Sequence, residues 1–150
     1  MTEVDRELHA VLIGIDGYLH GDRPGSIAAA DSWERELVEK GLRHENVWWC
    51  VSPAGRPRSN ATAARVRDAF GWLLGRLARP GVQAVVVVAA HVEEVDGARV
   101  LYPSDGRAID LERELVAPAA ALGTDHALTI VVVPRSTVGG APDGAAFAPV

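Results

Sequence analysis

Three uninterrupted apolar runs constrain the fold of this chain more than any other feature of its sequence. They are rich in β-branched residues and extend over Ala10–Ile15, Val82–Ala90 and Ala127–Val133. Continuous runs of this length and type are typical of strands that are buried on both faces of a sheet. A shorter run, Val47–Val51, predicts a fourth strand that lies nearer to an edge.

Helical patterns lie between these predicted strands. Apolar residues recur at helical spacing in Ser26–Lys40 and, most clearly, in Thr62–Arg79, where Asn60 or Thr62 can cap the start of the helix. A third helix is predicted to begin near Asp110 and to be ended or kinked by Pro118, because proline cannot continue the backbone hydrogen bonds of a helix.

Strands that alternate with helices imply a mostly parallel sheet. The sequence therefore predicts an α/β fold, a three-layer sandwich with flanking helices, formed by one domain over residues 1–140. The last residues, 141–150, are rich in Ala, Pro and Gly and are predicted to be a C-terminal tail. Asp96-Gly97, between two strand-like segments, predicts an additional β-hairpin.

Composition and charge exclude several classes of protein. The chain has 150 residues and a net charge of −5, which argues against a nucleic-acid-binding protein. Its single cysteine, Cys50, excludes an intramolecular disulfide and a multi-cysteine zinc site, and no residues have the spacing of metal ligands. No apolar run reaches the roughly 20 residues of a membrane span. We expect a cytoplasmic protein without cofactor or metal.

Candidate functional residues follow the predicted strands, because ligands of open parallel sheets bind at the carboxyl ends of the strands. Asp16-Gly17-Tyr18 follows the first strand, His91 follows the second apolar run, and Pro134–Gly140 follows the third. His91 and Ser136 are therefore predicted to converge at one end of the sheet.

Four segments, in this order, carry the pattern of one family. They are His9–Tyr18, which is similar to "ALLIGINxY", Pro24–Asp31, similar to "LPGAxNDA", Thr62–Gly81, similar to a helix followed by "RPGD", and Val85–His91 with Val100–Asp105, similar to "xxYFSGHG…YLLPxD". Together they resemble the caspase-like fold in its bacterial metacaspase or orthocaspase form, over its p20-like part.

The resemblance implies a cysteine–histidine pair of catalytic residues. His91 matches the histidine, and Ser136 stands at the position of the nucleophilic cysteine. The neighbouring acid and second histidine of the motif are replaced by Pro134 and Thr137. Asp31 matches an aspartate that lines the substrate pocket of metacaspases, although a solvent-exposed helix residue is the alternative interpretation. No acid that could orient His91 is evident from the sequence.

Cys50 and its neighbours are interpreted as structural. In the sheet order that the resemblance implies, 2-1-3-4, Cys50 lies two strands from the one that precedes His91, roughly 10 Å away, and we expect it to be a small buried hydrophobic residue. Trp48 and Trp49 should point to opposite faces, one toward the core and the other toward a more exposed surface.

The resemblance further implies that Ala127–Val133 is an edge of the sheet, since the family's p10-like segment would add strands beyond it. An apolar edge favours pairing with another strand. We expect this edge to be covered by the tail, by a second copy or by a different protein.

Three functions are therefore considered. The first is a catalytically degenerate caspase-like domain, a pseudoprotease that serves as a binding or scaffold module in a bacterial signalling or defence assembly. The second is a working hydrolase or endopeptidase in which Ser136 is the nucleophile and His91 its base. The third is a flavodoxin-like module that binds a small ligand near Asp16–Tyr18 and Ser136–Gly140.

Overall fold

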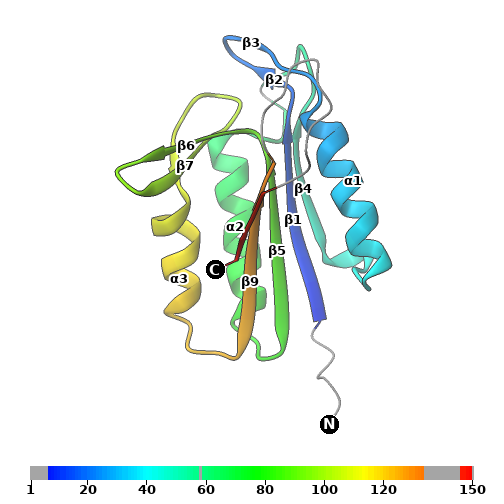
Figure 1. Ribbon diagram of the computed structural model, residues 1–150, viewed down its shortest axis with the longest axis vertical. Helices are drawn as coiled ribbons and strands as arrows, with labels where there is room; N and C mark the ends of the chain where they lie inside the picture. The colour runs from blue at the N-terminus through cyan, green and yellow to red at the C-terminus, as the bar shows by residue number, and fades with distance from the viewer. Residues whose placement is uncertain (1–6, 58, 134–145, 150) are drawn as a thin grey trace.

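A five-stranded sheet forms the centre of the molecule (Figure 1). The structure is a computed structural model that describes residues 7–57, 59–133 and 146–149. The strands lie in the order β10-β9-β5-β1-β4, with bounds β1 (Glu7–Ile15), β4 (Val47–Ser52), β5 (Val82–Ala89), β9 (His126–Val132) and β10 (Ala146–Pro149). The strands β1, β4, β5 and β9 of this sheet pair in parallel, and the order predicted for them is confirmed.

The central strands form because both of their faces are covered. Along β1, Val11 and Ile13 belong to one apolar cluster, whereas Ala10 and Leu12 belong to a second cluster on the opposite face. All four side chains are fully buried. A run without polar alternation is the pattern that such a doubly covered strand requires.

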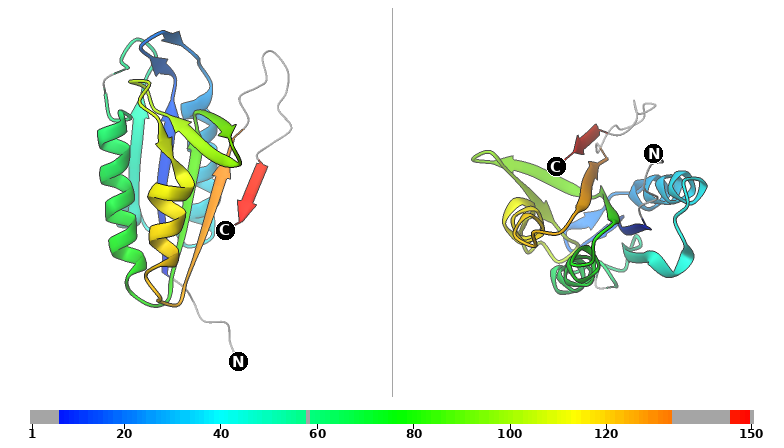
Figure 2. Two further views of the ribbon diagram at one scale, coloured as in Figure 1. Left: turned by 90° about the vertical axis from the view of Figure 1, so that its left-hand side faces the viewer. Right: turned by 90° about the horizontal axis from the view of Figure 1, so that it is seen from below.

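Three helical segments make the outer layers (Figure 2). Helix α1 (Ser26–Glu39) packs on the face of the cluster that contains Leu12. Helix α2 (Ala63–Leu77) and the segment η2–α3 pack on the other face, so the predicted three-layer α/β sandwich is confirmed. The hydroxyl of Thr62 accepts a hydrogen bond from the backbone N–H of Arg65 and caps α2, as expected.

Pro118 does not end the third helix, so the first of the two predicted outcomes, an end at the proline, is wrong. The helix begins as a π-helical segment, η2 (Glu112–Val116), and continues through Pro118 as α3 (Ala117–Ala120). In the wider turn the N–H of Ala117 donates to the carbonyl of Glu112, five residues back. The hydrogen bonds to the residue four positions back have therefore already been replaced before Pro118. The N–H that proline lacks consequently interrupts no regular series of α-helical hydrogen bonds.

Part of the segment expected to be a tail is a strand. Residues Ala146–Pro149 form β10, which pairs antiparallel with Thr129–Val132 of β9. The C-terminal segment therefore covers the edge beside β9, which is one of the three coverings that the sequence predicts.

Shorter elements decorate the sheet. Strands β2 (Gly17–Tyr18) and β3 (Gly21–Asp22) form a two-stranded hairpin, and a 3-10 turn, η1 (His44–Asn46), precedes β4. A separate small sheet has the order β6-β7-β8. Its strands are β6 (His91–Val95), β7 (Ala98–Tyr102) and β8 (Ile109–Asp110). Asp96 and Gly97 have φ values of 52° and 84°, as a primed two-residue turn requires, so the predicted hairpin is confirmed. Within the described residues, no helix has the length and hydropathy needed to cross a bilayer.

Candidate functional site

A cavity of about 400 Å³ lies at the carboxyl end of the sheet, where the sequence places the candidate residues. One wall comes from the segment that contains β2 and β3, and the other from β6, β7 and the loop that follows them (Figure 1). Its lining residues carry four aromatic rings and both signs of charge: Tyr18, His20, Arg23, His91, Glu93, Tyr102, Pro103 and Gly106.

His91 is held at this cavity by three neighbours. Its ring Nε2 lies 2.7 Å from Oε2 of Glu93, and its backbone N–H donates to the hydroxyl of Tyr18 at 3.0 Å. Its ring lies 5.3 Å from the ring of Tyr102, measured between centroids. The side chain of His91 is 32% exposed, so the imidazole is fixed in position yet reachable from solvent.

Glu93 is the acid that the sequence analysis did not identify. His91 and Glu93 are two residues apart on β6, and side chains at this spacing share one face of a strand. A carboxylate at one ring nitrogen fixes which nitrogen carries the proton and orients the imidazole for chemistry at the other. The signal was therefore present in the sequence once His91 was placed inside a strand rather than after one.

The opposite wall adds groups that sequence reasoning also missed. Tyr18 and His20 lie with their rings 5.4 Å apart, and Arg23 follows the hairpin. Within the described part of the chain, the exposed guanidinium of Arg23 makes no hydrogen bond or ion pair that would neutralise it. A planar guanidinium of this kind suits a carboxylate or a phosphate group. The cavity can therefore hold an anionic group beside aromatic rings.

The turn after β1 sets the position of this wall. Asp16 uses its carboxylate to accept the backbone N–H of Ser26 at 2.7 Å, so it caps α1 and serves the fold. A Cβ at Gly17 would collide with the carbonyl oxygen of Pro53, so the close approach of these two backbones requires glycine. Together these contacts fix the direction in which Tyr18 leaves the sheet.

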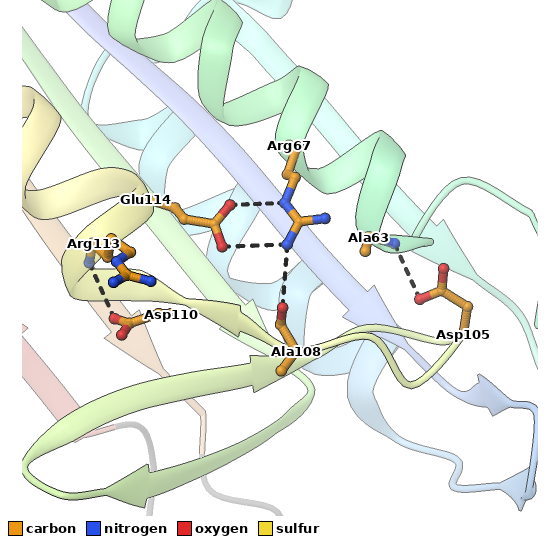
Figure 3. A network of polar contacts seen from close by, with 7 residues as sticks. All are labelled: Ala63, Arg67, Asp105, Ala108, Asp110, Arg113 and Glu114. Atoms are coloured by element: carbon orange, nitrogen blue, oxygen red, sulfur yellow. Dashed lines mark hydrogen bonds and ion pairs between the residues drawn. The ribbon is translucent and has the colours of Figure 1, made fainter.

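The loop behind Pro103 and Gly106 is tied to the start of α2 (Figure 3). The carboxylate of Asp105 accepts the backbone N–H of Ala63 at 3.2 Å, and Arg67 donates to the carbonyl of Ala108 at 3.2 Å. Nε of Arg67 also lies 2.7 Å from Oε1 of Glu114. The hydrogen bond from Arg67 holds the pKa of the Glu114 carboxyl below its usual range. This wall of the cavity is therefore braced by a helix of the core.

Asp31, the predicted substrate-binding residue, lies on α1 rather than at the cavity. Asp31 forms an ion pair with Arg35 one turn along α1, at 2.8 Å, and does not line the cavity. Its carboxylate is 43% exposed, which agrees with the alternative interpretation of a solvated helix residue. Ser136, Pro134 and Thr137 lie outside the described residues. Among those that are described, no group of His, Cys, Asp or Glu side chains could hold a metal ion.

Cys50 has the structural role that the sequence predicts. It is fully buried in β4, with Sγ 4.0 Å from the carbonyl oxygen of Arg65. Burial, with a smaller contribution from the negative charge of Asp68, raises the pKa of this thiol to about 12. The thiolate that a cysteine nucleophile needs is therefore almost absent near neutral pH.

The two tryptophans of β4 point to opposite faces, as alternation predicts. Trp48 packs on the α2 side, with its ring 5.6 Å from that of Trp72. Trp49 packs on the α1 side, and its Nε1 donates to Glu34 at 3.1 Å. Both are only partly buried, so each face keeps some exposed aromatic surface along this edge.

Comparison with known proteins defines the fold class. No family model matches the sequence, and no curated protein matches it. The structure is similar to that of the Drosophila initiator caspase Dronc, with a TM-score of 0.63 and 12% sequence identity. The match covers 93% of this chain and 60% of the Dronc chain. The chain therefore has a caspase-like fold, as its sequence pattern predicts, and spans about three fifths of that caspase.

Proposed function

We propose that this chain is a catalytically degenerate caspase-like domain, a pseudoprotease that binds other proteins in a bacterial signalling or defence assembly. The observation that carries the proposal is that the histidine and the single cysteine lie on strands that are not neighbours in the sheet. His91 and its cavity lie at the carboxyl end of β5, whereas the chain's single cysteine is buried in β4, two strands away in the sheet. A pKa of about 12 also denies that cysteine a nucleophilic role.

The sequence around Ser136 supports the same proposal. The family motif needs an acid, a cysteine and a histidine, and this chain has Pro134, Ser136 and Thr137 at those positions. A serine hydroxyl becomes nucleophilic only beside a well-oriented base. The metacaspase-type ancestry and the bacterial assembly are parts of this proposal that follow from the resemblance in sequence pattern. The cytoplasmic location is the expectation drawn from composition.

We propose the edge formed by β9 as the place where a protein partner binds. The predicted edge, Ala127–Val133, is paired with β10 from Thr129 to Val132, and β10 pairs with no residue of β9 before Thr129. A partner strand could displace β10 or add to its outer side by main-chain hydrogen bonds. The pairing of β10 shows that this edge accepts an antiparallel strand.

Active-site labelling tests the proposal. The chain, Ser136→Ala and Ser136→Cys are each treated with a fluorophosphonate probe and with a Lys/Arg-directed peptide inhibitor. We expect no labelling of the unmodified chain above the level of Ser136→Ala. Labelling that disappears in Ser136→Ala would overturn the pseudoprotease proposal, because it would show a reactive serine. Labelling of Ser136→Cys alone would indicate that the cavity has kept its shape and lost only its nucleophile.

One observation favours the second candidate, a hydrolase that uses Ser136 with His91. The contact of 2.7 Å between His91 and Glu93 supplies the orienting acid that a serine nucleophile needs. If this function is correct, Glu93→Gln should lower the labelling rate of Ser136 by at least tenfold while leaving the fold unchanged, whereas Glu94→Gln, on the other face of β6, should not.

The flavodoxin-like alternative receives less support. Such sheets continue with a fifth parallel strand, whereas the fifth strand here, β10, is antiparallel. The carboxylate of Asp16, which that alternative assigns to a ligand, is already used by the start of α1.

A further inference from the structure

The edge of the sheet at β4 differs in kind from the edge at β9. Residues Val47–Val51 carry no charge, contain no proline and show no bulge against β1. No strand of the described chain pairs with the outer side of β4. Charges, prolines and bulges are the means by which native edges avoid pairing with other chains, and this segment has none of them.

The open backbone groups of this edge can be assigned to particular residues. Backbone groups of successive residues in a strand point to alternate sides. The carbonyl of Ser52 accepts the N–H of Asp16, which places Ser52, and with it Cys50 and Trp48, on the β1 side. Val47 and Trp49 therefore direct their N–H and C=O groups outward. In the described part of the chain no hydrogen bond reaches these four groups.

The far end of the edge is already occupied. Val51 also points outward, but its carbonyl accepts the N–H of Asn60 at 3.0 Å, because the loop after β4 folds back there. An added strand can therefore pair fully with Val47 and Trp49 only. The open part of the edge is two outward residues with Trp48 between them.

We propose that a second copy of this chain pairs with this edge, antiparallel and centred on Trp48. In this register the N–H and C=O groups of Val47 in one copy bond to the C=O and N–H groups of Trp49 in the other. The twofold axis generates the same two hydrogen bonds between Trp49 of the first copy and Val47 of the second. A protomer with two outward residues is self-complementary under a twofold axis, which is the commonest symmetry of homo-oligomers. The two five-stranded sheets become one continuous sheet.

The side chains on both faces suit this register. On the α2 side the two Trp48 rings meet at the axis, each already beside Trp72 of its own chain. On the α1 side each Val47 lies opposite Trp49 of the other copy, and pairs of aromatic and β-branched residues stabilise antiparallel strands. Tryptophans that are half-buried in one chain become the centre of the interface, where this residue type is enriched.

The charges of α2 are complementary under the same axis. Arg76 lies over the ring of Trp72, at 5.1 Å, and Trp72 lies beside Trp48 of β4, so this face of α2 is on the β4 side. Asp68 shares the face, because residues four apart on a helix lie on one side of it. Asp68 and Arg76 lie one turn on either side of Trp72 in the sequence. An antiparallel copy therefore sets Asp68 on the same side of the axis as Arg76 of the other chain, twice.

The first measurement is the molar mass in solution, by sedimentation equilibrium of the full chain. We expect a species of twice the protomer mass of 15.9 kDa. Val47→Glu places a carboxylate beside Trp49 and Glu34 of the other copy and should return the mass to that of the monomer, with an unchanged circular dichroism spectrum. Val95→Glu is the matched control, since Val95 is 43% exposed on β6, which belongs to the separate three-stranded sheet, and it should remain dimeric.

A second variant tests the register. Trp48→Cys in a Cys50→Ser background should form an intermolecular disulfide under mild oxidation, because residues on the axis of an antiparallel pair approach closely enough for one. Val95→Cys in the same background should not. A wild-type chain that stays at 15.9 kDa at all concentrations would overturn the proposal. So would a dimer that survives Val47→Glu and gives no crosslink at position 48.

Discussion

The two edges of the central sheet differ in whether their outward backbone hydrogen-bonding groups are paired within the chain. At β9 the chain adds a short antiparallel strand of its own, β10, over Thr129–Val132. At β4 the chain leaves the backbone of Val47 and Trp49 open and surrounds it with partly exposed tryptophans. An edge that is closed within the chain can be joined by a partner strand only in place of its own cover or outside it, whereas an open apolar edge can be paired directly. The two proposed binding edges therefore differ in what a partner strand must displace.

The largest expected effect concerns the reactivity of Cys50 in β4. Because burial raises the pKa of this thiol from 9.0 to about 12, its thiolate fraction at pH 8 should be about a thousandfold lower than that of an exposed cysteine. Alkylation should therefore be at least about a thousandfold slower in the native chain than in urea, because the reagent must also reach a fully buried sulfur, and it should accelerate as the pH rises. Fast native labelling at pH 8 would mean that the β4 edge opens locally and that Cys50 is not kept buried in solution.

The second prediction compares how much a buried side chain of β9 and a half-buried side chain of β4 contribute to the free energy of unfolding. Ile130 in β9 is fully buried, and Ile130→Ala should lower the free energy of unfolding by about 2–5 kcal/mol. Val47→Ala, at a half-buried position of β4, should cost less than about 1 kcal/mol. Urea denaturation measures both values. Equal losses would show that the open edge is packed as firmly as the covered one.

The third prediction removes the cover from β9. A chain that stops after Ala145 lacks β10, and it loses backbone hydrogen bonds that contribute about 0.5–1.5 kcal/mol each. We expect a loss of roughly 1–3 kcal/mol in stability and association beyond the dimer, seen as a rise in mass by light scattering. Repeating the deletion in the Val47→Glu background isolates β9, because β4 is then blocked. An unchanged mass there would show that β9 needs no cover.

The smallest expected effect concerns the link between β4 and α1. Trp49→Phe removes the hydrogen bond of 3.1 Å to Glu34 while keeping most of the aromatic surface. The loss should be about 0.5–1.5 kcal/mol in urea denaturation. Glu34→Gln can still accept that bond through its amide oxygen and should cost less. The reverse ranking would show that the charge of Glu34, rather than the hydrogen bond, fixes the edge tryptophan.

The strands and their order could be predicted because burial on both faces leaves a direct signature. A run such as Val85–Val88 has few alternatives in a soluble chain, and the helices between the runs determine that the strands are parallel. The capping of α2 by Thr62 and the turn at Asp96-Gly97 are also local features that the residue types specify. The π-helical start of the third helix is not local in this sense, since it depends on how Pro118 is accommodated by the turn before it.

The candidate site was predicted only in part. His91 lines the cavity because it follows a recognisable strand, and its catalytic role stays a prediction. Its contact with Glu93 was overlooked although the two residues share one face of β6. Tyr18 and Arg23 reach the cavity only because the chain folds back after β1, and that course depends on Gly17 passing close to Pro53. Contacts between loops of this kind have no periodic signature, which is why the sequence alone did not reveal them.

The walls of the cavity have a further consequence for how this protein can change over time. They come from two hairpins and a loop outside the five-stranded sheet, and apart from Tyr18 their lining residues do not belong to the core cluster below them. Substitutions at His20, Arg23 or Glu93 therefore change the lining of the cavity at little risk to folding. The cavity can be remodelled by small steps, each of which leaves a folded molecule.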